Sequence, residues 1–348
     1  MVHFGQENIS ENPLNLRGAA MNPTDLNRLQ LLVSNTHSIK KEFPWQHASL
    51  MRLAALLYAV EDREADLSSI RTCHESIKQS TGALSMFRGS LSFGLSAMLS
   101  LNGDPPGALS DTLGAYEEMK AYSFKPSDYL VVAAYELAGG AQPGRRTEIV
   151  RRALFFYDGM KKNHPYLTSH DDYIFAVMLG LSELEPEPAL VRMEQIYAQL
   201  KPDYHATNSL QALSQVLVLG DADAAALDRL AELRSTLRER KLRMDKTYTL
   251  PSLGLLALLP TEVRLIADAI EQADAYLREQ KGFGGWHVQE QERLLLSSAV
   301  VISRSVNEAA RQLSSPTLAA VLTNLIAAQQ ATMLASLTAI TVVNSSSN

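Results

Sequence analysis

The lysines of this chain recur at a nearly constant interval. All eleven fall into seven clusters, whose leading members from Lys41 onward are 37, 42, 41, 40, 40 and 40 residues apart. Self-similarity at a fixed period of this size is typical of helical repeat arrays. The clusters are Lys40 with Lys41, Lys78, Lys120 with Lys125, Lys161 with Lys162, Lys201, Lys241 with Lys246, and Lys281.

Each lysine cluster ends one predicted helix and precedes another. An amphipathic stretch such as Ile149–Lys161 leads up to the lysine, which is a favourable residue at the negative end of a helix dipole. A loop and an apolar run of 10–12 residues follow, rich in Ala, Leu and Met, which favours helix over strand. We expect apolar helices to start near Ser49, Ser90, Asp128, Asp171, Ser209, Thr249 and Glu290.

These apolar helices constrain the architecture. A helix that is apolar nearly all round must be covered nearly all round. The sequence therefore predicts an all-α protein of about seven helical hairpins, arranged as a closed or nearly closed α/α toroid with the apolar helices inside. The alternative is an open α-solenoid. We expect one repeat domain over residues 23–311, preceded by a disordered or extended segment, residues 1–22.

Charge and cysteine content exclude several classes of protein. The net charge is −6, and no basic stripe exists beyond the spaced lysines, so we expect no nucleic-acid partner. Cys73 is the single cysteine, which excludes an intrachain disulfide and a CxxC motif. The N-terminal residues contain no apolar segment of the kind found in secretory signals, so a cytoplasmic location is expected.

The C-terminal segment, residues 312–348, carries no charged residue. Its length would allow a membrane span, but Asn324, Gln329 and Gln330 lie in its middle and disfavour one. Apolar residues at three- and four-residue steps predict a helix that packs on the array or at a homo-oligomer interface, with a disordered Ser/Asn end.

Residues whose side chains could bind a ligand or take part in a reaction gather at one edge of the predicted array. We call this the lysine edge: it is formed by the loops that lead from each amphipathic helix to the next apolar one. Five of the eight histidines and both tryptophans fall in these loops or in the first turns after them. The loops at the opposite edge contain Glu, Asp, Pro and Gly, which is ordinary turn chemistry. The lysine edge is therefore the predicted place for a pocket.

The fourth loop of this edge, residues 163–173, has the densest set of polar groups. His164, His170, Asp171 and Asp172 are candidate acid/base groups or ligands of a divalent metal, whose identity the sequence leaves open. The alternative is structural: Ser169 caps the following helix, and the two aspartates favour its dipole.

Further candidates come from the other loops of this edge. Arg88 could hold an anionic ligand or pair with Asp128. Aromatic residues would form an apolar wall suited to an apolar or cationic small molecule. The remaining candidate ligand-binding residues are Trp45, Tyr129, Tyr173, Trp286 and His287.

Three strings carry a family resemblance: Phe87-Arg88-Gly89, residues 163–173, and residues 279–284. With the small-residue tail around Gln329, they resemble the bacterial family called domain of unknown function 4003. That family implies a helical protein and no activity. A weaker likeness, of fold alone, is to the α/α barrels of terpene cyclases and protein prenyltransferases, although the full cyclase acid motif and a second metal motif are missing.

The sequence leaves three functions open. The first is a small-molecule enzyme or metabolite-binding protein with its pocket at the lysine edge and acid/base or metal-ligand groups in the fourth loop. The second is a non-enzymatic repeat scaffold that binds a peptide or a protein. The third is a prenyl-handling or terpenoid cyclase-like enzyme. A deep pocket would favour the first, and an open concave groove the second.

Overall fold

The computed structural model describes residues 20–142, 144–204, 207–285 and 287–312, and those residues form 14 α helices and no strand. The all-α prediction is confirmed. Trp286 and the predicted C-terminal helix after Gln312 lie outside the described residues, as do residues 1–19.

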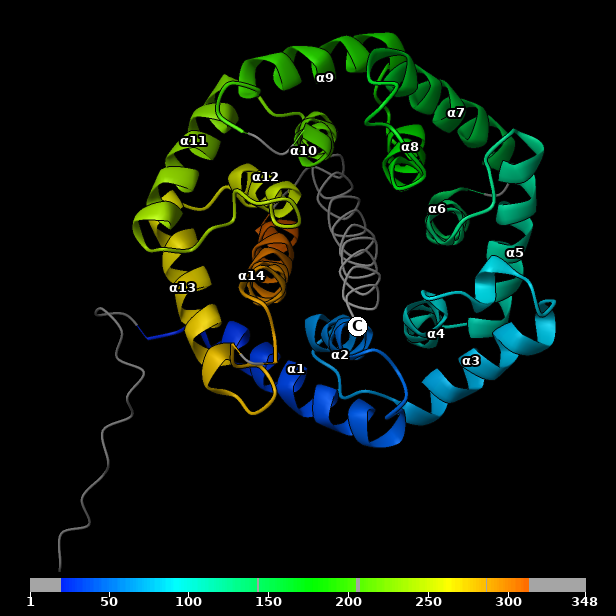
Figure 1. The fold of residues 1–348 in the computed structure, drawn as a ribbon, viewed down its shortest axis with the longest axis horizontal. Coiled ribbons are helices and arrows are strands. Elements are labelled where there is room, and N and C mark those ends of the chain that lie inside the picture. Colours follow the sequence, from blue (N-terminus) through cyan, green and yellow to red (C-terminus); the bar gives the residue numbers. More distant parts are fainter. Residues whose placement is uncertain (1–19, 143, 205–206, 286, 313–348) are drawn as a thin grey trace, which may run out of the picture.

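Seven amphipathic helices form an outer layer (Figure 1). They are α1 (Pro23–Glu42), α3 (Leu67–Ser80), α5 (Pro105–Ala121), α7 (Arg146–Asn163), α9 (Pro186–Leu200), α11 (Ala224–Glu239) and α13 (Val263–Glu279). Their starts follow local chemistry. Asp104 caps α5 by accepting a hydrogen bond from the Gly107 amide, and Asp223 does the same for α11 at the Ala226 amide.

Seven apolar helices form the inner layer. They are α2 (Ala48–Val60), α4 (Ser92–Leu101), α6 (Asp128–Gly140), α8 (Asp172–Leu181), α10 (Thr207–Leu219), α12 (Leu250–Leu258) and α14 (Glu290–Gln312). Each begins within two residues of the start that the sequence predicts. A short 3-10 helix, η1 (Met86–Arg88), precedes α4.

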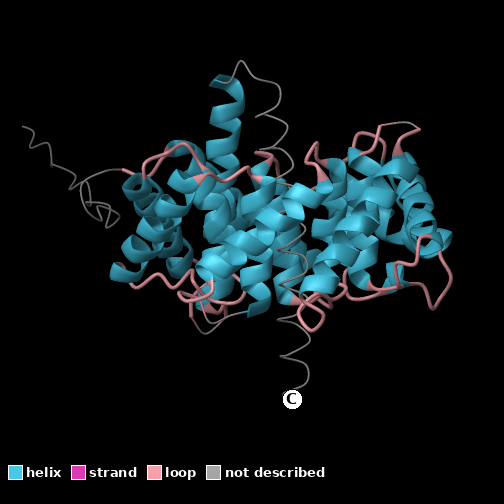
Figure 2. Ribbon diagram, turned by 90° about the horizontal axis from the view of Figure 1, so that it is seen from above, coloured by secondary structure: helices cyan, strands magenta, loops and turns pink. Residues whose placement is uncertain are grey.

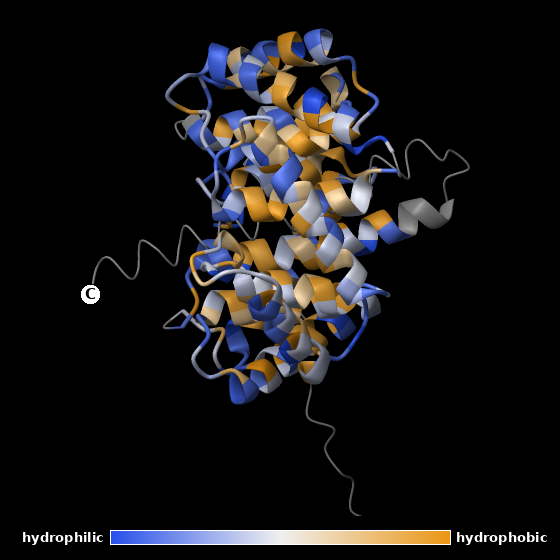
Figure 3. Ribbon diagram, turned by 90° about the vertical axis from the view of Figure 1, so that its right-hand side faces the viewer, coloured by the Kyte–Doolittle hydropathy of each residue, from blue (hydrophilic) through white to orange (hydrophobic). Residues whose placement is uncertain are grey.

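The inner helices α2 and α4 are buried on almost every side. Every residue of Ser49–Val60 in α2 and of Leu91–Ser100 at α4 is buried. Several serine hydroxyls in this apolar layer bond to their own helix, as Ser96 does to the Ser92 carbonyl at 2.7 Å and Ser297 does to the Arg293 carbonyl at 2.9 Å, so these donors are paired within the core. Figure 3 shows the molecule from one side, where hydrophobic (orange) and hydrophilic (blue) segments alternate along the helices.

The two ends of the array are in contact. Helix α1 packs against α13 and α14, and α14 also packs against α2. The Arg52 Nε of α2 lies 2.7 Å from Glu292 Oε1 of α14, and both side chains are buried. Arg28 of α1 donates to Ser303 Oγ at 2.9 Å, and Arg304 of α14 pairs with Asp25 at 2.9 Å. These contacts define a seam between the first and last hairpins.

Arginines of the outer layer bind the ends of inner helices. Arg152 of α7 donates to the carbonyls of Gly180, Ser182 and Leu184 at 2.8–3.0 Å, where α8 ends. Arg229 of α11 donates in the same way where α12 ends. Because the last carbonyls of a helix have no partner within it, these arginines satisfy free acceptors and hold the outer and inner helices of one hairpin together.

Loops lie at both edges of the ring (Figure 2). Outer helices run toward one edge and inner helices run back, so all loops that follow a lysine cluster lie together. The lysine edge is the lower one in Figure 2, opposite the end of α14. At the lysine edge the topology thus brings together residues that are far apart in the sequence, such as His37 and Lys281, 244 positions apart, whose ring Nε2 and carbonyl oxygen are 3.0 Å apart.

The seam makes a prediction about stability. Arg52→Met leaves the Glu292 carboxylate buried without its partner and should lower the free energy of unfolding by about 3–5 kcal/mol. The double variant R52M/E292L removes both charges and should recover most of that loss. Urea denaturation measures both values.

Arg145→Met is the control, because Arg145 forms an exposed pair with Glu148 on one helix. Its midpoint should stay at that of the parent protein. Equal midpoints for R52M and the parent would mean that the seam pair contributes nothing.

Candidate functional site

Asp172 is the most buried acid of the predicted fourth-loop site. Its Oδ2 accepts a hydrogen bond from the Ser169 amide at 2.9 Å, and its Oδ1 accepts one from Gln215 Nε2 at 2.8 Å. Burial, and after it the charge of Asp171, raises the pKa of Asp172 to about 7. Both oxygens therefore bond within the protein, one to the turn before α8 and one to α10.

A polar network continues from Asp172 through the core. Gln211, one helical turn before Gln215 on α10, donates to Thr168 Oγ1 at 2.8 Å. Lys161 donates to the carbonyls of Pro165 and Thr168 at 2.7 and 2.5 Å. The two glutamines are residues that the sequence analysis missed. Their four-residue spacing within an otherwise apolar run was the available signal.

Asp171 and His170 are also bonded locally. Ser169 Oγ donates to Asp171 Oδ1 at 2.9 Å, and Asn208 Nδ2 donates to Asp171 Oδ2 at 3.2 Å. The His170 ring stacks on Tyr173 with centroids 5.3 Å apart. These contacts join the fourth loop to the start of α10 and fix the turn.

His164 faces a different part of the molecule. Its Nε2 lies 3.0 Å from Glu194 Oε2, and its ring packs 4.4 Å from that of Tyr197; both partners belong to the outer helix α9. Within the described ranges, no hydrogen bond or ion pair joins His164 to Asp171 or Asp172. The structure therefore does not gather the four predicted catalytic side chains around one space.

The predicted aromatic wall is also divided. Tyr173 is buried, its hydroxyl accepts from the Lys125 amide at 3.2 Å, and its ring packs on Phe124. Tyr129 is half-buried, and burial followed by the charges of Asp171 and Asp128 raises its pKa to about 12. Trp45 is 72% exposed, and His287 is exposed.

Arg88 and Asp128 do not pair with each other. Arg88 donates to the carbonyls of Lys78 and Thr81 at the end of α3. Asp128 accepts from Ser90 Oγ at 2.6 Å. A Cβ at Gly89 would lie 2.3 Å from Asp128 Oδ1, so only glycine lets this carboxylate approach the loop so closely. These contacts join the loop in front of α4 to the end of α3 and to the start of α6.

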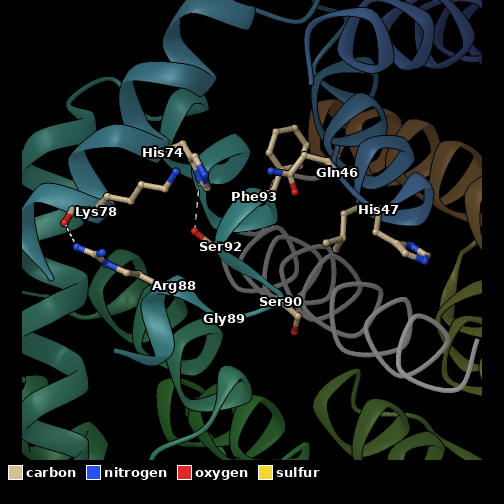
Figure 4. A pocket seen from close by; sticks show the side chains of 10 residues that line it. Gln46, His47, His74, Lys78, Arg88, Gly89, Ser90, Ser92 and Phe93 are labelled. Carbon is tan, nitrogen blue, oxygen red and sulfur yellow. Dashed lines mark hydrogen bonds between the residues drawn. The ribbon is translucent and has the colours of Figure 1, made fainter. Parts of the chain in front are cut away.

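A pocket of about 420 Å³ opens beside this loop, at the lysine edge (Figure 4). Its floor is apolar and buried, with Leu50 of α2 and Phe93 of α4. The first two hairpins supply all of its walls. The other lining residues are Gln46, His47, His74, Lys78, Arg88, Gly89, Ser90 and Ser92.

The polar groups of this pocket are mainly basic. His74 Nδ1 lies 3.2 Å from Ser96 Oγ and 3.4 Å from Ser92 Oγ, which fixes its ring. Burial is the largest cause that lowers the pKa of His74 and of His47, so both imidazoles are neutral at pH 7. Lys78 and Arg88 add two cations, and the ammonium of Lys78 has no acceptor among the described residues. The arrangement is suited to an anion above an apolar floor.

Of these lining residues, Arg88 was predictable from the sequence as a ligand-binding residue, and His47 is one of the five histidines of the lysine edge, whereas no pattern in the sequence singled out His74 or Lys78 as part of a site. Over the described ranges, no group of three or more His, Cys, Asp or Glu side chains could hold a metal ion. No helix within those ranges has the length and apolar character needed to cross a membrane.

The fold defines an all-α protein built from helical hairpins. The chain belongs to the family described as protein of unknown function (DUF4003), whose model matches residues 35–331. This finding confirms the resemblance seen in the motifs. The chain is 24% identical over 250 residues to the uncharacterized protein YeaA of Bacillus subtilis strain 168, which covers 68% of this chain and 75% of that protein. No solved structure matches it.

The Asp172 network makes a prediction about pH. Because the pKa of this carboxyl is raised from 3.8, its contribution to stability is fully present below about pH 4 and is lost as the pH rises through about 7. The side chain in the Asp172→Asn variant cannot ionise. As the pH rises from about 4 to about 7, the free energy of unfolding of this variant should therefore fall less than that of the parent protein. Urea denaturation at both ends of the range measures the difference.

Asp104→Asn makes the same isosteric change at an exposed helix cap and serves as the control. It should retain the pH profile of the parent. A D172N profile that matches the parent would show that ionisation of Asp172 does not limit stability.

Proposed function

We propose that this protein binds a small anionic molecule in the pocket between its first two hairpins. The observation that carries the proposal is that His47, His74, Lys78 and Arg88 all line one hollow with an apolar floor. Lysine and arginine bind carboxylates and phosphates through charge-assisted hydrogen bonds, and an apolar floor favours a ligand with a carbon skeleton.

The lining residues would have different roles in binding the anion. Lys78, at the end of α3, would meet the anionic group directly, since its ammonium is uncommitted. Arg88 is held by carbonyls of α3, so it would contribute charge and fix the loop rather than reach out. His74 is oriented by two serines and neutral at pH 7, which suits a hydrogen-bonding group or a general base.

This proposal changes the ligand expected from the sequence. An apolar or cationic molecule would suit a wall of exposed aromatics, whereas the pocket walls carry basic groups. It also moves the site from the fourth loop to the first two. The oxygens of Asp171 and Asp172 already accept hydrogen bonds from neighbouring residues, which supports their structural interpretation.

The alternatives have weaker support. A peptide-binding scaffold needs an open concave groove, and the contacts of α1 with α13 and α14 leave less room for one. A cyclase-like reaction needs carboxylates that are free to hold metal and diphosphate, and the fourth-loop carboxylates are bonded internally. A binding protein, or an enzyme with His74 as its base, therefore remains the better account.

Pyrophosphate and citrate are suitable probes of the pocket. We expect calorimetric titration to detect binding of at least one, and Lys78→Ala to weaken it by roughly tenfold to a hundredfold, since a hydrogen bond to a charged group contributes about 1.5–3 kcal/mol. Lys125→Ala is the matched control: it removes an exposed lysine at the same edge, outside the pocket. Affinities that are equal for K78A and K125A, or no binding of either anion, would refute this site.

A further inference from the structure

The two edges of the ring differ in charge. All eleven lysines lie at the lysine edge, in the last turns of outer helices or in the loops after them. Its loops carry a net formal charge of +5, and those of the opposite edge carry −8. The basic residues of the first set are Arg88, Lys125, Lys201, Arg240, Lys241, Arg243, Lys246 and Lys281, against Asp171, Asp203 and Asp245. The acidic residues of the second are Glu61, Asp62, Glu64, Asp66, Asp104, Glu183, Glu185, Asp221, Asp223 and Glu262, against Arg63 and Arg145.

Five lysines of the lysine edge are available to a partner. All five are exposed, and their ammonium groups make no hydrogen bond or ion pair with any residue that the structure describes. They belong to loops that lie around the ring from α5 to α14. They are Lys125, Lys201, Lys241, Lys246 and Lys281.

The same edge displays large apolar side chains. Trp45 is 72% exposed, Leu84 96%, Met86 38% and Tyr166 98%. Each lies in a loop of the lysine edge, including η1. The remaining large exposed apolar side chains among the described residues are Phe155, Val191 and Leu265, which lie on three separate outer helices. Exposed apolar side chains beside lysines on one face indicate an interaction surface.

We propose that the lysine edge is a docking surface for an anionic lipid bilayer. Lysines are attracted to the negative surface potential of such a bilayer, and tryptophan and tyrosine favour the headgroup region. The anionic bilayer would repel the acidic opposite edge. The ring would therefore lie with its lysine edge on the bilayer and its axis perpendicular to the membrane plane. The proposal is independent of the ligand proposed for the pocket.

Features of this surface favour lipid over a protein partner. A protein interface usually has a contiguous apolar centre with charged residues at its rim. Here Trp45, Leu84 with Met86, and Tyr166 lie on three different loops, with lysines distributed around the ring. A fluid bilayer can receive side chains at separate points, each inserting among headgroups, and it needs no matching shape.

Vesicle sedimentation tests the proposal on the full chain. The protein should sediment with vesicles of equal parts phosphatidylcholine and phosphatidylglycerol, and not with pure phosphatidylcholine. Salt should release it, because the screening length falls from about 10 Å at 0.1 M to about 3 Å at 1 M. The double variant K241Q/K246Q should bind at least about tenfold more weakly, since each lysine near an anionic surface contributes about fivefold, or about 1 kcal/mol.

Matched triple variants separate insertion from general apolar exposure. W45S/L84S/Y166S should lose most vesicle binding, whereas F155S/V191S/L265S removes three exposed apolar side chains from the outer wall and should bind like the parent. In a W286F background, Trp45 is the single tryptophan, and its emission should shift to the blue on vesicle binding.

Two results would overturn the proposal. One is a lack of specificity in sedimentation: the parent protein sediments equally with both vesicle types, or the two triple variants lose vesicle binding to the same extent. The other is a dimer in analytical ultracentrifugation that only W45S/L84S/Y166S dissociates, which would make the lysine edge an interface between copies of this chain. Circular dichroism melting curves verify that each variant is folded, and a variant that unfolds early is replaced by its single substitutions.

Discussion

The inner helices impose the constraint on which the rest of the structure depends. A helix such as α2, buried along its whole length, cannot be left with one side in water, so neighbours must cover it on every side. An array of such helices leaves an uncovered face at each end unless the ends meet. The seam provides that cover. Its Arg52–Glu292 pair is buried. The two charges lose their hydration when the ends meet, and only the correct pairing of the two side chains compensates for that loss.

Closure also determines where chemistry can lie. All outer helices run toward the same edge, so the lysines that end them collect there together with the N-termini of inner helices. The lysines are favourable for the individual helix, because each faces a negative helix end. Repetition turns this local preference into a charged face that no single hairpin possesses. The arginines that bind inner-helix ends, such as Arg152 and Arg229, complete the hairpins at the opposite edge without adding positive charge to its loops.

Periodic and local features were predictable, and long-range pairing was not. The start of α6 follows from Ser127, whose side chain accepts from the Leu130 amide, and that of α12 follows from the apolar run after Thr249, so sequence alone located both closely. The role of Asp172 depends on Gln215, 43 positions later, and that of His164 on Glu194, one outer helix further on. The pocket joins His47 to His74 across two hairpins. No local pattern contains such pairings, because the packing of adjacent repeats creates them.

The pocket and the proposed lipid surface meet at one edge for a physical reason. Helix α3 ends there, so Lys78 and the carbonyls that hold Arg88 lie beside the first loop, which carries both Trp45 and His47. If Trp45 inserts among lipid headgroups, the mouth of the pocket faces the interfacial region, where the dielectric constant is lower than in bulk water and ion pairing is stronger.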